Sequence, residues 1–189
     1  MIQNHLLQLL SFVAMEPPGS DSDDSLRDRA VEVLRNLRPL APQDIVLGQY
    51  GSGTVESSQV PGYLMEDGVA EDSMTETYAA LRVFVDTERW RQVPFYLRTG
   101  KRLKARHADI RIVFRQQHHV IGGRGEPNVV IIRIQPDEGI ALAMNVQKPG
   151  EEFATESVMM DFCHHCYFGP NTPEAYESIL HNVIEGDRT

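Results

Sequence analysis

A succession of strand-like segments joined by short connections constrains this chain more than any other feature of its sequence. From Thr75 onward, runs rich in β-branched and aromatic residues are separated by breaks such as Pro136–Gly139, which is too short to hold a helix. Parallel neighbours need a crossover of about a dozen residues or more, so we expect antiparallel pairing. The expected strands are Thr75–Glu88, Pro94–Arg98, Asp109–Gln116, Asn128–Gln135, Ile140–Val146 and Val158–Tyr167.

Helix-like segments flank this strand region on both sides. Met1–Met15 and Ser25–Leu37 carry apolar residues at helical spacing, and Pro173–Ile184 follows Thr172, a suitable N-cap. Helices first, then strands, then a final helix indicate an α+β fold with a mainly antiparallel sheet. Because 189 residues suit one domain, we expect a single domain over residues 1–189.

Composition excludes several classes of function. The formal net charge is −9, whereas a nucleic-acid binder carries a large basic face, so we expect no nucleic-acid partner. No stretch approaches the roughly 18 to 20 apolar residues that cross a bilayer, and we expect no membrane partner. The two cysteines are too few for a secreted disulfide scaffold, which favours a reducing cytoplasm.

His5 is the first candidate for chemistry. A histidine can act as a general base near neutral pH when a carboxylate fixes its tautomer. The alternative is a core histidine that donates to a backbone carbonyl. No acidic residue precedes Glu16, so a carboxylate partner would have to come from elsewhere.

The second candidate is the basic segment Arg98–Arg106, which directly follows the hydrophobic run Phe95–Leu97. Several converging Arg and Lys donors suit a phosphate group, and Gly100 could bend the strand and re-aim them. The alternative is a solvated basic edge strand, whose charges prevent aggregation.

Two further motifs carry less weight. The run Cys163–Cys166 reads Cys-His-His-Cys, but successive side chains of a strand alternate faces, so four neighbours cannot surround one ion. We therefore expect no metal site. The segment Gly122–Gly125 does not match the dinucleotide-binding fingerprint and joins two strand-like segments, so we interpret it as a hairpin loop.

The order of short motifs along nearly the whole chain resembles one family, the C-terminal, substrate-side domain of glucose-6-phosphate dehydrogenases. The motifs are Gln3–Gln8, Val13–Pro17, Leu26–Asp28, Val33–Arg35, Arg38–Pro39, Val46–Tyr50, Val60–Tyr63, Ser73–Thr77, Val93–Lys101, Ile132–Pro136 and Pro173–Glu177. Each motif is weak by itself, but their shared order is highly specific.

The resemblance implies a role for four residues. His5 would remove the proton of the C1 hydroxyl of glucose 6-phosphate, and hydride would pass to NADP to give the 6-phosphogluconolactone. Lys101, Arg106 and Gln135 would bind the substrate. An ideal strand puts Lys101 and Arg106 on opposite faces, so the resemblance requires the backbone to leave a regular strand near Gly100 or beyond.

The resemblance also implies an architecture and partners. The fold would be a large, mainly antiparallel sheet with helices on one side, paired through the sheet into a homodimer. NADP would bind mainly to the family's N-terminal dinucleotide-binding domain. That domain is missing from this chain, which we interpret as cut at both ends and inactive alone. The setting would be the cytoplasmic pentose phosphate pathway, without a metal. The alternative is a stand-alone, non-catalytic sugar-phosphate-binding or dimerisation module.

Overall fold

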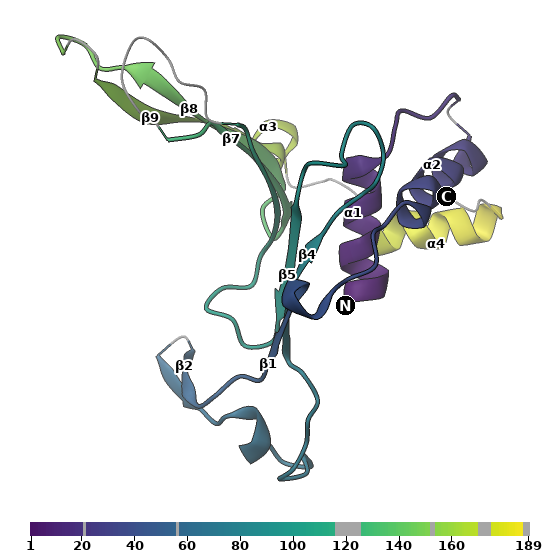
Figure 1. The fold of residues 1–189 in the computed structure, drawn as a ribbon, viewed down its shortest axis with the longest axis vertical. Coiled ribbons are helices and arrows are strands. Elements are labelled where there is room, and N and C mark those ends of the chain that lie inside the picture. Colours follow the sequence, from purple (N-terminus) through teal and green to yellow (C-terminus); the bar gives the residue numbers. More distant parts are fainter. Residues whose placement is uncertain (21, 56, 116–125, 152–153, 170–174, 187–189) are drawn as a thin grey trace. The chain divides into compact units, whose positions relative to one another are not determined.

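The computed structural model describes residues 1–20, 22–55, 57–115, 126–151, 154–169 and 175–186 (Figure 1). The chain divides into two compact units, the first formed by Met1–Lys104 and the second beginning at Ala105. Within the described ranges, no helix is long and apolar enough to cross a membrane.

The first unit begins with helices. A π-helical turn, η1 (Ile2–Leu6), continues into α1 (Leu7–Ala14), and α2 covers Asp23–Arg35. The hydroxyl of Ser22 caps α2 by accepting a hydrogen bond from the backbone N–H of Ser25 at 3.3 Å. Both helices predicted from apolar spacing are therefore present, although the first turn of the first one is wound more loosely than an α-helix.

The strands of the first unit form two antiparallel sheets. β1 (Ile45–Gly48), β4 (Tyr78–Val83) and β5 (Phe95–Gly100) pair in the order β1-β4-β5. A separate hairpin joins β2 (Gly53–Val55) to β3 (Ser58–Val60), between the 3₁₀ turns η2 (Pro42–Asp44) and η3 (Tyr63–Met65). The expected strand Thr75–Glu88 is thus shorter at both ends, and β4 forms its centre.

The core of the first unit lies between β4 and the two helices. Alternate residues along this stretch, Ala79, Leu81, Val83 and Val85, are buried, as the two-residue period of a strand requires. Leu81, Val83 and Val85 cluster with Leu10 and Ala14 of α1 and with Val33 of α2. Trp90 packs against this cluster, and its indole N–H donates to the carbonyl of Ala14 at 2.8 Å. The predicted covering of one sheet face by helices is confirmed here.

The second unit contains a four-stranded antiparallel sheet in the order β6-β7-β8-β9. Its strands are β6 (Ala108–Val113), β7 (Val129–Gln135), β8 (Gly139–Gln147) and β9 (Thr155–Cys163), and two helices follow, α3 (His164–Phe168) and α4 (Ala175–Glu185). All strand pairings described are antiparallel, which confirms the α+β class. The prediction of a strand from Val158 to Tyr167 is wrong at its C-terminal end, because β9 ends at Cys163.

The registers of this sheet separate two faces of different chemistry. Residues directly opposite one another share a face, and one set of opposed residues is apolar except at the far end of β8 and β9, where Val146 opposes Glu156. We call it the apolar face: Ile110, Ile112, Val130, Ile132, Ile140, Leu142, Met144, Val158, Met160 and Phe162. Side chains at its β8–β9 end are widely exposed, with Ile140 at 50% and Met160 at 53%. The opposite face carries charged residues, including Asp109, Arg133 and Asp161.

The core packing predicts that truncation of the Val85 side chain lowers the stability of the first unit. Val85 is completely buried, so Val85→Ala removes buried apolar surface and leaves a cavity, and it should lower the free energy of unfolding by about 2 kcal/mol. Urea unfolding followed by the fluorescence of Trp90 measures this quantity in the first unit. The control is Val46→Ala, at a site 60% exposed, which should change it by about 0.5 kcal/mol or less. Equal effects of the two substitutions would contradict the assigned core.

Candidate functional site

His5 lies at the surface of the first unit. It belongs to η1, where its backbone N–H donates to the carbonyl of Met1 at 3.0 Å, and its side chain is exposed. Within this chain, His5 is therefore not part of a buried core. No carboxylate of the described residues forms an ion pair with the ring. The turn η1 contacts β5, which leads directly into the basic segment.

The basic segment leaves the strand where the resemblance requires it to. β5 ends at Gly100, the backbone N–H of Lys101 donates to the carbonyl of Thr77 at 2.8 Å, and Arg102 has a left-handed backbone with φ of 51°. A Cβ at position 100 would lie 2.9 Å from the ring of Tyr78. A side chain at position 100 would therefore require Tyr78 or Leu103 to shift. The predicted departure from a regular strand is confirmed, because β5 ends at Gly100.

Within this segment, Arg102 has a structural role. Its guanidinium pairs with the carboxylate of Glu66 at 2.5 Å and lies 5.3 Å from the centre of the Tyr50 ring. The hydroxyl of Tyr50 also donates to Glu66, at 3.1 Å. Lys101 is exposed and has no ion pair with a carboxylate in the ranges that the structure describes. Lys101 is thus available to bind an anion, whereas Arg102 is held by its neighbours.

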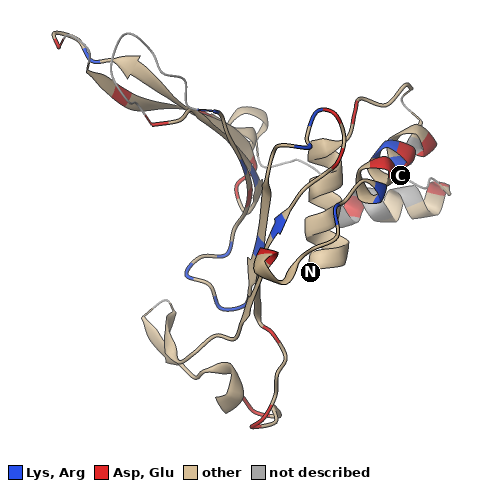
Figure 2. Cartoon of the chain, in the orientation of Figure 1, with Lys and Arg blue, Asp and Glu red and all other residues tan. Residues whose placement is uncertain are grey.

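The other two candidates belong to the second unit. Arg106 precedes β6, whose first residue, Ala108, pairs with Gln135 at the end of β7. The side chains of Arg106 and Gln135 are both exposed. Figure 2 shows basic residues along the segment that follows β5 and enters β6. Arg106 and Gln135 therefore belong to the same end of the four-stranded sheet.

An ion pair anchors the sheet beside Gln135. The guanidinium of Arg133 reaches across β8 and donates to the carboxylate of Asp161 and, at 3.1 Å, to the carbonyl of Phe162. This hydrogen bond lowers the pKa of the Asp161 carboxyl. The guanidinium passes over Gly139, where a Cβ would lie 2.6 Å from it and 2.3 Å from the Phe162 carbonyl. Glycine at 139 is thus a condition for this contact.

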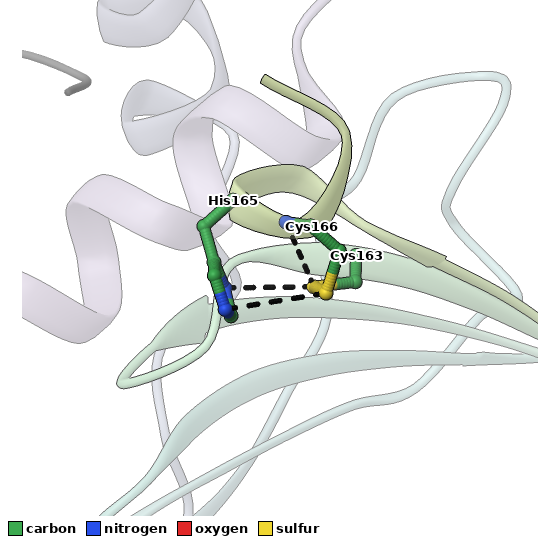
Figure 3. A group of neighbouring side chains, drawn as sticks. All are labelled: Cys163, His165 and Cys166. Carbon is green, nitrogen blue, oxygen red and sulfur yellow. Dashed lines mark hydrogen bonds between the residues drawn. A yellow bond between two sulfur atoms is a disulfide. The ribbon is translucent and has the colours of Figure 1, made fainter. Parts of the chain in front are cut away.

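The Cys-His-His-Cys run adopts a different structure from the one expected. We argued against a metal site because a strand alternates its side chains, but the chain turns into α3 after Cys163. That turn brings ligand atoms of Cys163, His165 and Cys166 within 4.8 Å of one another (Figure 3). The argument from alternation is wrong for this segment. The sequence signal for this cluster was the spacing of the two cysteines, which are separated by two residues. The segment Gly122–Gly125, interpreted above as a hairpin loop, lies outside the described residues.

These features define an α+β fold with antiparallel sheets, an exposed histidine on a turn that contacts β5, and basic residues that follow β5. The family model described as "Glucose-6-phosphate dehydrogenase, C-terminal domain" matches residues 1–189. The chain belongs to the glucose-6-phosphate dehydrogenase C-terminal domain family.

Individual relatives agree with this assignment. The glucose-6-phosphate 1-dehydrogenases of Chlamydia muridarum and Aggregatibacter actinomycetemcomitans are 42% and 47% identical, each over 100% of this chain and 39% of the relative. A solved glucose-6-phosphate dehydrogenase in complex with its substrate glucose-6-phosphate is 38% identical with a TM-score of 0.84, over 99% of this chain and 38% of that one. The chain thus spans about two fifths of the length of these relatives, and the resemblance in sequence and the fold are confirmed.

Proposed function

We propose that this chain supplies the substrate-side part of a dehydrogenase that oxidises D-glucose 6-phosphate to 6-phospho-D-glucono-1,5-lactone with NADP⁺. The observation that carries the proposal is the family match over residues 1–189. The exposed positions of His5 and Lys101 support it, because both side chains are accessible to a ligand. We further propose a cytoplasmic enzyme of the pentose phosphate pathway, on the family assignment alone.

In this proposal His5 is the general base. An imidazole accepts a proton near neutral pH, and loss of the C1 hydroxyl proton builds negative charge on the oxygen, which favours departure of hydride from C1. The exposed ring of His5 and its freedom from ion pairs with the described carboxylates are consistent with this role. A carboxylate that fixes its tautomer would come from a part of the enzyme other than the described residues.

Lys101, Arg106 and Gln135 are proposed to hold the substrate. Two cations suit the phosphate group, since hydrogen bonds between charged partners are about twice as strong as neutral ones. A side-chain amide can both donate to and accept from sugar hydroxyls. Exposure of all three side chains supports the assignment. On the family resemblance, we also propose that residues 1–189 form one domain.

The described residues do not fit a dinucleotide site. Such sites place a glycine-rich turn between a strand and a helix of a parallel sheet, and every described strand pair here is antiparallel. We therefore propose that NADP⁺, which accepts the hydride, is bound by a separate N-terminal domain. The chain alone should form no NADPH from glucose 6-phosphate.

Two substitutions separate the role of the base from the role of the phosphate ligand. They are made in an enzyme that contains this chain together with its cofactor domain. His5→Asn should lower kcat by about 10²- to 10⁴-fold, the contribution of a general base, with little change in KM. Lys101→Ala should raise KM for glucose 6-phosphate by about 10- to 100-fold, because a hydrogen bond to a charged group contributes about 1.5–3 kcal/mol. Steady-state NADPH formation measures both constants.

Two exposed residues provide matched controls for these measurements. His181→Asn changes a histidine that is 71% exposed on α4, and Lys148→Ala changes a lysine paired with Glu151. Both variants should keep the parent kinetics. Full activity of His5→Asn would contradict the assignment of the base, and an unchanged KM for Lys101→Ala would contradict the assignment of the phosphate ligand.

We also propose that the chain forms a homodimer through the apolar face of its four-stranded sheet. Exposed apolar patches of this kind are typical of protein–protein interfaces. Ile140, Met160 and Phe162 lie next to one another on β8 and β9 and are 50%, 53% and 42% exposed. Their burial against a second copy would remove this apolar surface from water.

Two neighbouring methionines on opposite faces of β9 test this proposal. Met160→Asp should weaken self-association by at least about tenfold, because it places a charge among apolar side chains. Met159→Asp is the control, since Met159 is equally accessible at 59% but lies on the other face. Sedimentation equilibrium gives the dissociation constant of each. Equal dissociation constants for the two variants would exclude the apolar face as the interface.

A further inference from the structure

Cys163 and Cys166 are held together by the fold itself. Cys163 is the last residue of β9 and pairs in register with Gly139, and Cys166 lies in the first turn of α3. Their Cα atoms are 5.2 Å apart, within the separation that a disulfide requires, and their sulfurs are bonded. The backbone N–H of His164 donates to the carbonyl of Glu138 at 3.0 Å. The start of α3 is therefore fixed to the sheet, and one helical turn carries Cys166 back to Cys163.

The groups around the sulfurs suit a thiolate as well as a disulfide. Nδ1 of His165 lies 3.5 Å from Sγ of Cys163, and its Nε2 lies 4.0 Å from Sγ of Cys166 (Figure 3). The backbone N–H of Cys166 donates to Sγ of Cys163 at 3.2 Å. Donors of this kind stabilise a cysteine thiolate, which is the reactive form in exchange. Both Cys166 and His165 are exposed, so a reagent in solution can reach this pair.

We propose that Cys163 and Cys166 form a reversible dithiol–disulfide site that exchanges with thiols in solution. A small-molecule thiolate attacks Sγ of the exposed Cys166, the bond between the two sulfurs breaks, and Cys163 leaves as a thiolate that accepts the hydrogen bond from the Cys166 N–H. A second thiolate then attacks the sulfur of the bound small-molecule thiol, the bond from that sulfur to Cys166 breaks, and Cys166 leaves as a thiolate. In sum, the protein disulfide and two thiols give two protein thiols and one small-molecule disulfide, with two electrons and two protons transferred.

The alternative to disulfide exchange is binding of a thiophilic cation such as zinc, because two thiolates and an imidazole are ligands that zinc prefers. The structure favours exchange for two reasons. The sulfurs are bonded to each other, and His164, which could supply a fourth ligand, has its Nδ1 3.8 Å from the carboxylate of Glu138. Structural zinc sites are almost always four-coordinate, and within the described ranges this group offers three ligands.

The test equilibrates the purified chain in glutathione buffers of increasing oxidised fraction, alkylates the remaining thiols and weighs the intact protein. We expect a single transition in which both thiols disappear together without a glutathione adduct. The transition should require about tenfold or more oxidised glutathione in urea than in the folded chain, because the fold holds the sulfurs together. Thiols that stay reduced in every buffer, or the same transition in urea, would overturn the proposal.

Variants and zinc identify the groups responsible. With the pair reduced, His165→Asn should slow alkylation at neutral pH several-fold, because the thiolate loses a donor, and His181→Asn should leave the rate unchanged. In Cys163→Ser, reaction with oxidised glutathione should leave one glutathionyl group on Cys166 as a mixed disulfide and release one glutathione, since the resolving thiol is gone. An unchanged rate in His165→Asn would remove the histidine from the proposal. Complete protection of both thiols by one equivalent of Zn²⁺ in the presence of glutathione would reassign the group as a metal site.

Discussion

Packing of α1 and α2 against the alternating apolar residues of β4 is the interaction on which the candidate site of the first unit depends. Leu10 and Ala14 of α1 are each 3% exposed against this strand. Since η1 continues directly into α1 and contacts β5, the same burial determines where His5 lies. β5 pairs with β4 and ends one residue before Lys101. One apolar core therefore positions both the proposed base and a proposed substrate ligand.

The second unit combines two surfaces in one sheet. Its apolar face is continuous across four strands, whereas the opposite face holds the ion pair between Arg133 and Asp161. Strand pairing produces this separation because opposed residues share a face. The end of the same sheet carries Gln135 and the cysteine pair, with Gly139 in register between Arg133 and Cys163. A single set of hydrogen-bonded strands thus supports proposed association, substrate binding and redox exchange.

Much of the fold could be predicted from the sequence, and the failures have physical causes. Antiparallel pairing followed from connections such as Pro136–Gly139, and helices from apolar spacing. The strand end at Cys163 was missed because Cys-His-His-Cys has neither a two-residue nor a helical hydrophobic period. The roles of His5 and Lys101 came from family resemblance. The contact between Arg102 and Glu66 joins residues far apart in the chain, so no local pattern indicates it.

The claim that the phosphate side of the substrate site resides in this chain can be measured directly. Calorimetric titration of glucose 6-phosphate should show binding to the chain, and glucose, which lacks the phosphate, should bind at least about tenfold more weakly. The double variant Lys101→Ala, Arg106→Ala should lose the binding, and Lys148→Ala, which alters a lysine paired with Glu151, should retain it. Absence of binding to the parent chain, or equal affinity in the parent and the double variant, would contradict this account.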